Sequence, residues 1–268
     1  MNSSIKLRER LRVNNNEFYH RAIYKILGRL SKVRVFNITG IRRSGNHAII
    51  EWILHHYSGF SVHYNDIKNL SSPLDAYYIL YKWKLGNPAI TFSFEDISIK
   101  DFLNNAGLFL NAERKFNILI MRDPYNLFAS RYNWQTEQGH RFRTSLKYRR
   151  KIIALWKNHA ERYLTWSDES SLNIPINYNR WCLDMDYQKT LLKSLDVPIT
   201  KVNQIYQIPN FGYGSSFTGI DPIYDKSLFQ QRFHKFRDKE NFMEIFEDDE
   251  LVALSDRIFG KLDFNNIT

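Results

Sequence analysis

The stretch FNITGIRRSGNHAIIEWI, residues 36–53, constrains the fold of this chain more than any other part of it. Residues 33–39, VRVFNIT, are rich in β-branched and apolar side chains, which predicts a strand buried inside a sheet. A turn containing Gly40 and Gly45 follows, and residues 47–57 then predict an apolar helix. A buried strand that leads through a tight turn into a helix is typical of a parallel α/β sheet.

The alternation of strands and helices continues along the chain. We predict further strands at residues 89–97, 115–121 and 172–179, and further helices at residues 125–134 and 186–195. Asp123 is the expected N-cap of the helix that follows the 115–121 strand, with Pro124 at its first position. The sequence therefore predicts three layers, with a mostly parallel sheet between two layers of helices. Ligands of such sheets bind beyond the carboxyl ends of the strands.

The length of 268 residues suits one α/β domain. We expect this domain to span residues 31–268 and to follow a helical arm at residues 1–30. Residues 18–33, FYHRAIYKILGRLSKV, alternate basic and apolar side chains with a helical period. We expect this arm to pack on the domain or, as the alternative, to contact an acidic membrane surface peripherally.

Composition indicates a cytoplasmic protein with an anionic partner. The single cysteine, Cys182, leaves no intramolecular disulfide framework and favours a reducing compartment. No run of residues approaches the length of a membrane-spanning helix, and the N-terminal residues lack the apolar core of a signal peptide. The formal charge of +10 suits nucleic acid, a membrane surface or a small polyanion, and charge by itself does not choose among them.

The turn after the first strand has the chemistry of an anion site. Its backbone N–H groups converge at the start of a helix, where the helix dipole adds partial positive charge. Arg42 and Arg43 add two fixed cations. A metal-dependent nucleotide loop would continue with Lys and then Ser or Thr, whereas this turn continues with Asn46 and His47. We therefore expect the turn to bind a phosphate-like group without a metal ion.

A second polar motif follows the strand at residues 115–121. Arg122 comes directly after the strand, and Ser130 lies eight positions later, about two helical turns on. Asn126 shares the helix face of Ser130. This spacing can present a guanidinium and a hydroxyl to one anion.

The two motifs, in this order, resemble those of the sulfotransferases that use 3′-phosphoadenosine 5′-phosphosulfate. The resemblance covers residues 33–219 and implies the P-loop type of α/β fold. It implies that Arg122 and Ser130 hold the 3′-phosphate. It also implies that the first turn holds the 5′-phosphosulfate through Arg43, Ser44, Gly45, Asn46 and His47, to which we add the neighbouring cation Arg42.

Two further stretches extend the resemblance to the nucleotide. INYNRW places Tyr178 where the family often has a tyrosine near the adenine. FGYGSSFTG, residues 211–219, resembles a late loop that closes on the 3′-phosphate, here through Ser215 and Ser216.

The chain also departs from the family pattern. Arg43 replaces a common lysine, which keeps the positive charge but disfavours proton donation to the leaving group. Ala48 stands where many members place a tryptophan against the adenine, and Trp52, one turn further along, is the candidate substitute. The late loop lacks the usual basic residue.

The resemblance implies a general base at the end of the strand that contains TFSFEDI. A positioned carboxylate that takes the proton of an acceptor hydroxyl or amine accelerates such a transfer by about 10²–10⁴-fold. Glu95 is our first choice and Asp96 our second. Because adjacent strand residues point to opposite faces, only one of the two should enter the site. His63 and His47 are the alternatives. Arg43 would stabilise negative charge on the leaving oxygen.

The sequence leaves the acceptor open among carbohydrates, glycolipids and small molecules. We expect its pocket around residues 62–67, 77–83 and 132–142, which are rich in Tyr, Trp, Asn and His. One rival function is a non-catalytic module that holds nucleic acid or anionic lipid on basic segments such as RFRTSLKYRRK, residues 141–151. Another is a metal-independent enzyme that acts on ATP. The sequence carries no recognisable nucleic-acid motif, so no specific nucleic acid is expected, and it does not predict the oligomeric state.

Overall fold

The structure is a computed structural model and describes residues 34–57, 61–67, 89–106, 114–137, 146–168, 170, 172–197 and 232–261. The predicted helical arm, Ser215 and Ser216, and the predicted acceptor segment at residues 77–83 lie outside these ranges. They therefore stay predictions.

Five parallel strands form one sheet in the order β2-β3-β1-β4-β5. The strands are β1 (Arg34–Gly40), β2 (Ser61–Tyr64), β3 (Ala89–Glu95), β4 (Arg114–Met121) and β5 (Asn173–Asn177). The central strands β1 and β3 are buried over almost their whole length, because they have neighbours on both sides and helices on both faces. The predicted parallel α/β sheet is confirmed.

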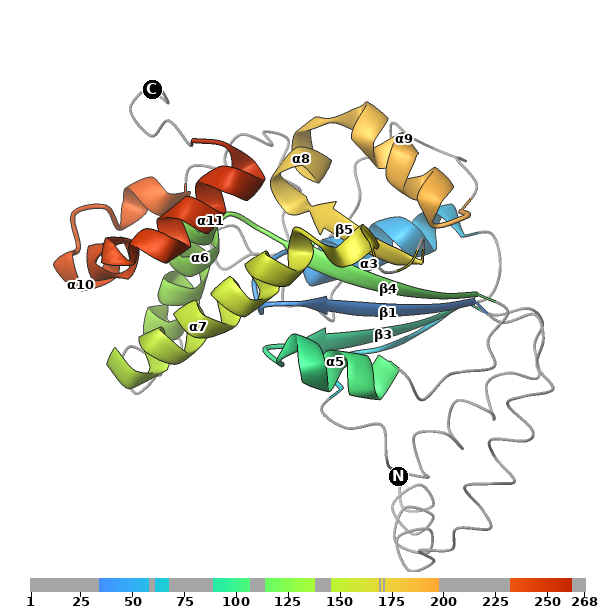
Figure 1. The fold of residues 1–268 in the computed structure, drawn as a ribbon, viewed down its shortest axis with the longest axis horizontal. Helices are drawn as coiled ribbons and strands as arrows, with labels where there is room; N and C mark the ends of the chain where they lie inside the picture. Colours follow the sequence, from blue (N-terminus) through green and yellow to red (C-terminus); the bar gives the residue numbers. More distant parts are fainter. Residues whose placement is uncertain are drawn as a thin grey trace, which may run out of the picture.

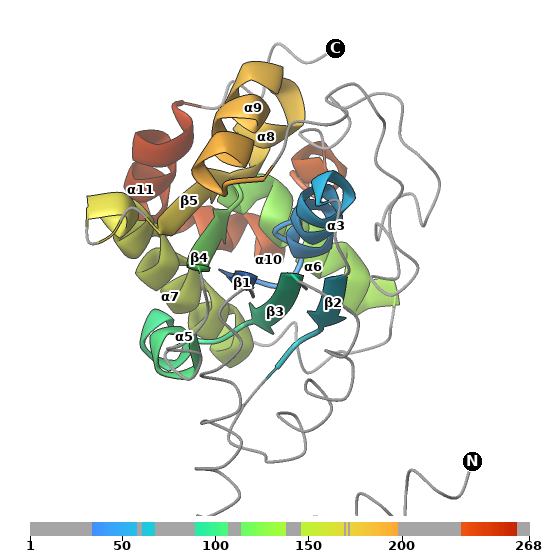
Figure 2. The same ribbon diagram turned by 90° about the vertical axis from the view of Figure 1, so that its right-hand side faces the viewer.

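Helices cover both faces of the sheet and make three layers (Figure 1). One face carries α3 (Asn46–His56), α8 (Tyr178–Leu183) and α9 (Met185–Ser194), and the other carries α5 (Ile99–Ala106) and α7 (Leu146–Tyr163). Figure 2 shows the same arrangement along the strands, with α8 and α9 above β4 and β5 and with α5 and α7 on the opposite side. Next to the carboxyl ends of the strands stand α6 (Pro124–Glu137), η6 (Arg232–Lys235), α10 (Glu240–Met243), η7 (Glu244–Glu247) and α11 (Asp249–Phe259).

Separate hydrophobic clusters hold the layers together. Phe36 and Ile38 of β1 face α3 and α9 and pack with Trp52, and none of these three side chains is exposed. Val35 points to the opposite face, into the cluster that contains Phe102 of α5. This alternation follows from the two-residue period of a strand, so β1 contributes to the core on both of its faces.

A ladder of asparagine side chains joins three adjacent strands. Asn37 Nδ2 donates to Asn117 Oδ1 at 3.1 Å, and Asn117 Nδ2 donates to Asn173 Oδ1 at 3.1 Å. The three residues are partners in the registers of β1 with β4 and of β4 with β5. This chain of amides favours the register, because a shift by one residue would break both hydrogen bonds between the three side chains.

The predicted cap of α6 is confirmed. The carboxylate of Asp123 accepts hydrogen bonds from the backbone N–H of Asn126 at 2.8 Å and from the side chain of Asn179 at 2.9 Å. The predicted strand at residues 172–179 is shorter than expected, because the side chain of Asn177 caps a new helix by accepting the backbone N–H of Arg180 at 3.0 Å. Tyr178 therefore starts α8 and does not end a strand.

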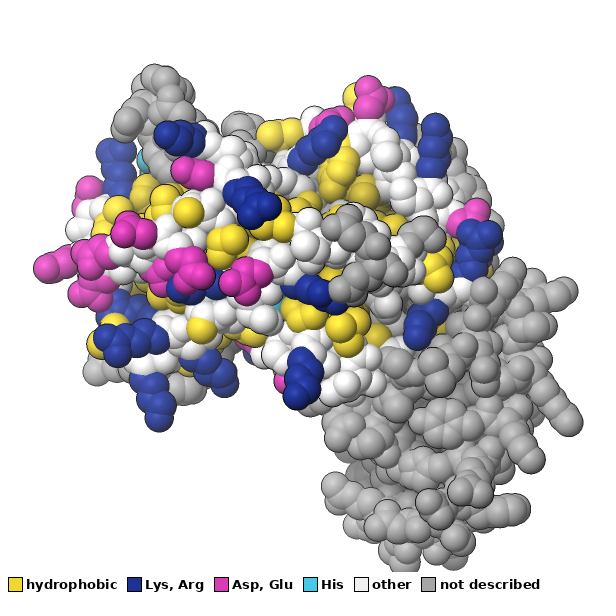
Figure 3. All heavy atoms as spheres, viewed as in Figure 1, with side chains coloured by type: hydrophobic (Ala, Val, Ile, Leu, Met, Phe, Trp, Pro, Cys, Tyr) yellow, Lys and Arg dark blue, Asp and Glu magenta, His cyan; other side chains and the backbone are white. Residues whose placement is uncertain are grey.

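Acidic and basic side chains gather on neighbouring parts of the surface. Figure 3 shows acidic groups over the C-terminal helices, next to basic groups over α7. Lys157 of α7 pairs with Asp248 at 2.9 Å and with Glu250 at 2.5 Å, and Arg149 pairs with Glu244 at 2.9 Å. Some cations of the predicted basic helix therefore bind to the protein itself. No helix in the described ranges is both long and apolar enough to span a membrane.

Candidate functional site

The carboxyl ends of β1 and β4 form the centre of the candidate site. The chain leaves β1 toward β2 on one side of the sheet and leaves β4 toward β5 on the other, so these adjacent strands are the topological switch point. Gly40 at the end of β1 lies beside Ile120 of β4. The turn after β1 and Arg122 after β4 therefore emerge next to each other.

The turn after β1 has a backbone conformation that most residues avoid. Arg43 has φ 79° and Gly45 has φ 95°, both in the left-handed region. Gly45 also needs the space, since a Cβ atom there would lie 2.0 Å from Cε2 of Tyr178. For Arg43 a left-handed backbone costs about 1–3 kcal/mol, which the surrounding contacts must offset.

Arg43 and Arg232 both donate to Ser130, and Arg122 holds the backbone of Arg43 beside them. Arg43 Nε donates to Ser130 Oγ at 3.4 Å, and Arg232 Nη1 donates to the same oxygen at 3.2 Å. Arg122 Nη1 donates to the backbone carbonyl of Arg43 at 3.2 Å. Its guanidinium carbon lies 5.2 Å from the ring centre of Tyr178. The structure thus brings together residues of both sequence motifs.

Arg232 is the residue that sequence reasoning missed. It starts η6 and is 7% exposed, and the backbone N–H of its neighbour Phe233 donates to Asn126 Oδ1 at 3.1 Å, which ties η6 to α6. Burial lowers the pKa of Arg232 to about 9, and the nearby charges of Arg122 and Arg43 act in the same direction. A bound anion would offset both effects. No spacing rule links Arg232 to Ser130, which lies 102 residues earlier.

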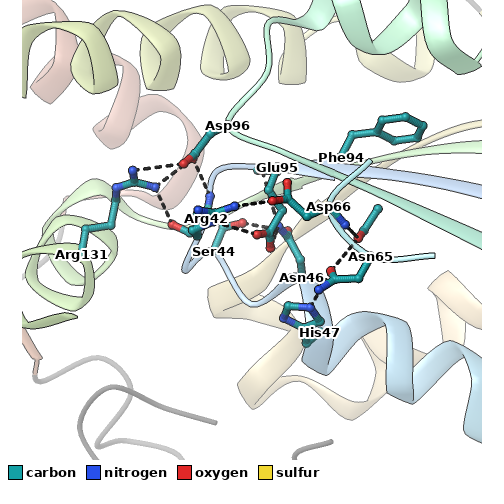
Figure 4. Close-up of polar contacts among 12 residues, drawn as sticks. Arg42, Ser44, Asn46, His47, Asn65, Asp66, Phe94, Glu95, Asp96 and Arg131 are labelled. Atoms are coloured by element: carbon teal, nitrogen blue, oxygen red, sulfur yellow. Dashed lines mark hydrogen bonds and ion pairs between the residues drawn. The ribbon is translucent and has the colours of Figure 1, made fainter. Parts of the chain in front are cut away.

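Arg42 takes a different position from the one predicted. Its Nε donates to Glu95 at 3.0 Å and its Nη2 donates to Asp66 at 2.5 Å (Figure 4). Burial lowers the pKa of Arg42, but the hydrogen bond and charge of Glu95 and the charge of Asp66 raise it overall. The side chain of Arg42 is thus held by carboxylates, whereas that of Arg43 reaches Ser130.

The side chains of Ser44 and Asn46 form hydrogen bonds to each other and to Glu95, and they do not point outward from the turn. Ser44 Oγ donates to Asn46 Oδ1 at 2.9 Å, and Asn46 Nδ2 donates to Glu95 Oε1 at 3.0 Å. Both residues are at most 3% exposed. These bonds preserve the shape of the turn, so backbone N–H groups at the start of α3 are what this part of the chain can offer an anion.

Asp96 lies just beyond β3 in a left-handed conformation, with φ 56°. Its carboxylate accepts two hydrogen bonds from Arg131, at 2.8 and 3.2 Å, and one from the backbone N–H of Arg42 at 2.9 Å (Figure 4). Burial raises the pKa of Asp96, but the charge and hydrogen bonds of Arg131 outweigh burial and lower it. A carboxylate stabilised in this way is a weak proton acceptor.

The two candidate histidines lie toward β2. His47 Nε2 is 2.9 Å from Asn65 Oδ1, and the ring centres of His47 and His63 are 6.3 Å apart. Burial and then the charge of His47 lower the pKa of His63 to about 4. His63 is therefore neutral at pH 7.

The candidate adenine contacts are largely covered. Trp52 is 0% exposed and packs edge to face against Trp181, with ring centres 5.7 Å apart. A face of Trp52 is thus not available to an adenine, and its expected role as a substitute for the family tryptophan is not supported. Tyr178 is 6% exposed, and its ring packs against Gly45 and lies under the guanidinium of Arg122.

The arrangement can bind a compact polyanion beside a carboxylate. Arg43, Arg122 and Arg232 supply the positive charge, and Glu95, 5% exposed, contacts the opposite side of the same turn through Asn46 and Arg42. Comparison of the chain with models of known protein families and with curated protein sequences finds no match. The geometry of the site is therefore the basis for assigning a function.

Proposed function

We propose that this chain is a sulfotransferase that moves a sulfuryl group from 3′-phosphoadenosine 5′-phosphosulfate to a hydroxyl or amine of an acceptor. The observation that carries the proposal is the convergence of Arg43 and Arg232 on Ser130, with Arg122 bound to the backbone carbonyl of Arg43 beside them, beyond the switch point of the sheet. Burial first, and then the charges of Arg122 and Arg43, lower the pKa of Arg232, so three positive charges lie close together with little solvent around Arg232. Such a potential suits a ligand with several negative charges close together.

The residues of the site divide between the two ends of this donor. Arg122, Ser130 and Arg232 would hold the 3′-phosphate with a hydroxyl and two guanidinium groups. The N–H groups at the start of α3 and the side chain of Arg43 would hold the 5′-phosphosulfate. The contact between Arg43 and Ser130 places the two groups of residues side by side.

Glu95 is the preferred base for the acceptor. Its carboxylate touches the turn through Asn46 and Arg42, whereas that of Asp96 is held by Arg131 with a lowered pKa. Glu95 would take the acceptor proton as the acceptor oxygen or nitrogen bonds to sulfur. Arg43 would stabilise the charge that develops on the departing phosphate oxygen, since an arginine keeps its own proton.

Binding of paired nucleotides tests the assignment of Arg122. We expect Arg122→Ala to weaken binding of 3′-phosphoadenosine 5′-phosphate by about 10- to 100-fold, the value of a charge-assisted hydrogen bond. Binding of adenosine 5′-phosphate, which lacks the 3′-phosphate, should change little. Calorimetry with both ligands measures this difference. Arg180→Ala is the control, because the side chain of Arg180 is exposed and pairs with Asp184, away from the site residues. Equal losses for the two nucleotides would contradict the proposal.

Turnover tests the assignment of Glu95. Using a ³⁵S-labelled donor and a panel of sugars and phenols, we expect Glu95→Gln to lower kcat by about 10²-fold or more on any acceptor that the parent protein sulfates. Its affinity for 3′-phosphoadenosine 5′-phosphate should stay within about threefold of the parent value, because the glutamine carbonyl can still accept the hydrogen bond from Asn46 that preserves the shape of the turn. Full activity of the variant would contradict this assignment and transfer the role of base to Asp96 or His63.

A further inference from the structure

The strained residue of the turn is held from both sides by arginines. Arg131 Nη1 donates to the carbonyl of Arg42 at 3.0 Å, and Arg122 Nη1 donates to the carbonyl of Arg43 at 3.2 Å. These carbonyl groups flank the Cα atom of Arg43, so their orientation sets both of its backbone torsions. The two hydrogen bonds therefore select the left-handed conformation of Arg43, φ 79°.

Hydrogen bonds from both terminal nitrogens hold the guanidinium group of Arg131 in place. It is 3% exposed, and Asp96 accepts hydrogen bonds from both of its terminal nitrogens at 2.8 and 3.2 Å. Nη2 also donates to Tyr148 Oη of α7 at 2.6 Å. The same Asp96 accepts the backbone N–H of Arg42 at 2.9 Å. The Asp96–Arg131 pair thus holds Arg42 by both its N–H and its carbonyl group (Figure 4).

We propose that Asp96 and Arg131 are positioning residues that act through Arg43. By holding the Arg42 peptide groups they keep the Arg43 backbone left-handed, and this conformation directs its guanidinium toward Ser130. The anion then meets a cation that is already in place and does not have to be ordered at the moment of binding. The link to ligand affinity and turnover rests on the proposed function, whereas the effect on Arg43 itself does not.

No other side chain at position 131 can make all the hydrogen bonds that Arg131 makes. Lysine at position 131 keeps one positive charge for Asp96, but an ammonium group lacks the planar fork that reaches a carboxylate and a carbonyl group together. Arg131→Lys therefore tests positioning while it retains the buried charge pair. Tyr148→Phe is a milder second variant, since it removes a single hydrogen bond to Arg131.

Side-chain NMR of the arginine Nε–H groups measures the position of Arg43 directly. In the protein without ligand, Arg131→Lys should shift and broaden the Arg43 resonance, and Tyr148→Phe should shift it less in the same direction. Arg149→Lys is the matched control, because Arg149 also pairs with a carboxylate, Glu244, and donates to a backbone carbonyl, that of Asn241. An unchanged Arg43 resonance in both Arg131→Lys and Tyr148→Phe would overturn the proposal.

A double-mutant cycle separates positioning from a general loss of stability. Arg131→Lys should weaken binding of 3′-phosphoadenosine 5′-phosphate by about tenfold or more in the parent protein. It should have almost no further effect in an Arg43→Ala background, because the residue through which it acts is then absent. Equal losses in both backgrounds would refute the positioning role. If the Arg43 resonance moves but the parent protein does not bind this nucleotide, the positioning role stands and the proposed function fails.

Discussion

Replacing Gly45 with alanine should destabilise the fold and weaken the anion site together. A Cβ atom at this position would lie 2.0 Å from Cε2 and 2.4 Å from Cδ2 of Tyr178. That ring stacks on Trp181 and is 6% exposed, so it has little room to move away. Overpacking of this kind costs about 1–3 kcal/mol, and the left-handed backbone of a non-glycine residue adds about 1–3 kcal/mol.

Gly260→Ala provides the control for the backbone contribution. Gly260 also has a positive φ, 76°, but a Cβ atom there would meet nothing within 4 Å. Its ψ of 169° lies in a region that is almost confined to glycine, whereas Gly45 has ψ 16°, so the backbone cost of alanine is at least as large at Gly260. We therefore expect Gly45→Ala to lower the free energy of unfolding by up to about 3 kcal/mol more than Gly260→Ala does, because of the overlap with Tyr178. Urea unfolding followed by tryptophan fluorescence measures both values, provided that the two variants unfold with similar m-values.

A loss of less than about 1 kcal/mol for Gly45→Ala would refute this reasoning, because it would show that the Tyr178 ring moves away freely and that the backbone is not strained. Ligand binding supplies a second criterion. The ring also lies under the guanidinium of Arg122, with 5.2 Å between its centre and the guanidinium carbon. Gly45→Ala should therefore weaken binding of 3′-phosphoadenosine 5′-phosphate, whereas Gly260→Ala should leave it unchanged.

Two further substitutions test the buried polar groups of the sheet. Since the pKa of His63 is about 4 in the folded protein and 6.5 when unperturbed, the unfolded chain binds more protons between these values and stability should fall as the pH drops from 6.5 to 4. His63→Asn should reduce this loss by up to about 3 kcal/mol in urea titrations across that interval, and an unchanged pH slope would contradict the assignment. Asn117→Ala should lower the free energy of unfolding by about 1–3 kcal/mol, because it leaves the buried amide of Asn37 without its acceptor. Replacing Asn37 and Asn117 together by valine should recover part of that loss, and a double variant less stable than Asn117→Ala would argue against the ladder.

The candidate site could be predicted where a local pattern encodes it. The apolar strands at residues 33–39 and 115–121 end at polar residues, and parallel strands bring their carboxyl ends to one edge. Chain geometry alone therefore places Arg43 near Arg122. The spacing of eight residues from Arg122 to Ser130 is also a local pattern, since about two helical turns bring a side chain back to a similar face of α6.

The partners of long polar side chains could not be predicted in this way. Arg42 and Arg43 are adjacent in sequence, yet Arg42 pairs with Glu95 and Asp66 while Arg43 reaches Ser130. The left-handed backbone at Arg43 separates the two side chains, and no residue-type rule signals this conformation for an arginine. The position of Asp96 directly after β3 makes it a candidate base in the sequence. In the structure the same position brings its carboxylate to Arg131 and to the backbone N–H of Arg42.

The sequence by itself determined the layered parallel sheet, the cap of α6 and a turn with two arginines between β1 and α3, because each depends on hydrophobic period or on neighbours within about two helical turns. Only the tertiary structure decided that Arg43 and not Arg42 reaches Ser130, that Arg232 joins it from a distant segment, and that Arg131 holds Asp96. The partner of each arginine depends on the cost of burying its charge. It also depends on which carboxylate, hydroxyl or carbonyl group is close enough to accept its hydrogen bonds. Such groups come into contact only when residues 35 to 102 positions apart are packed side by side.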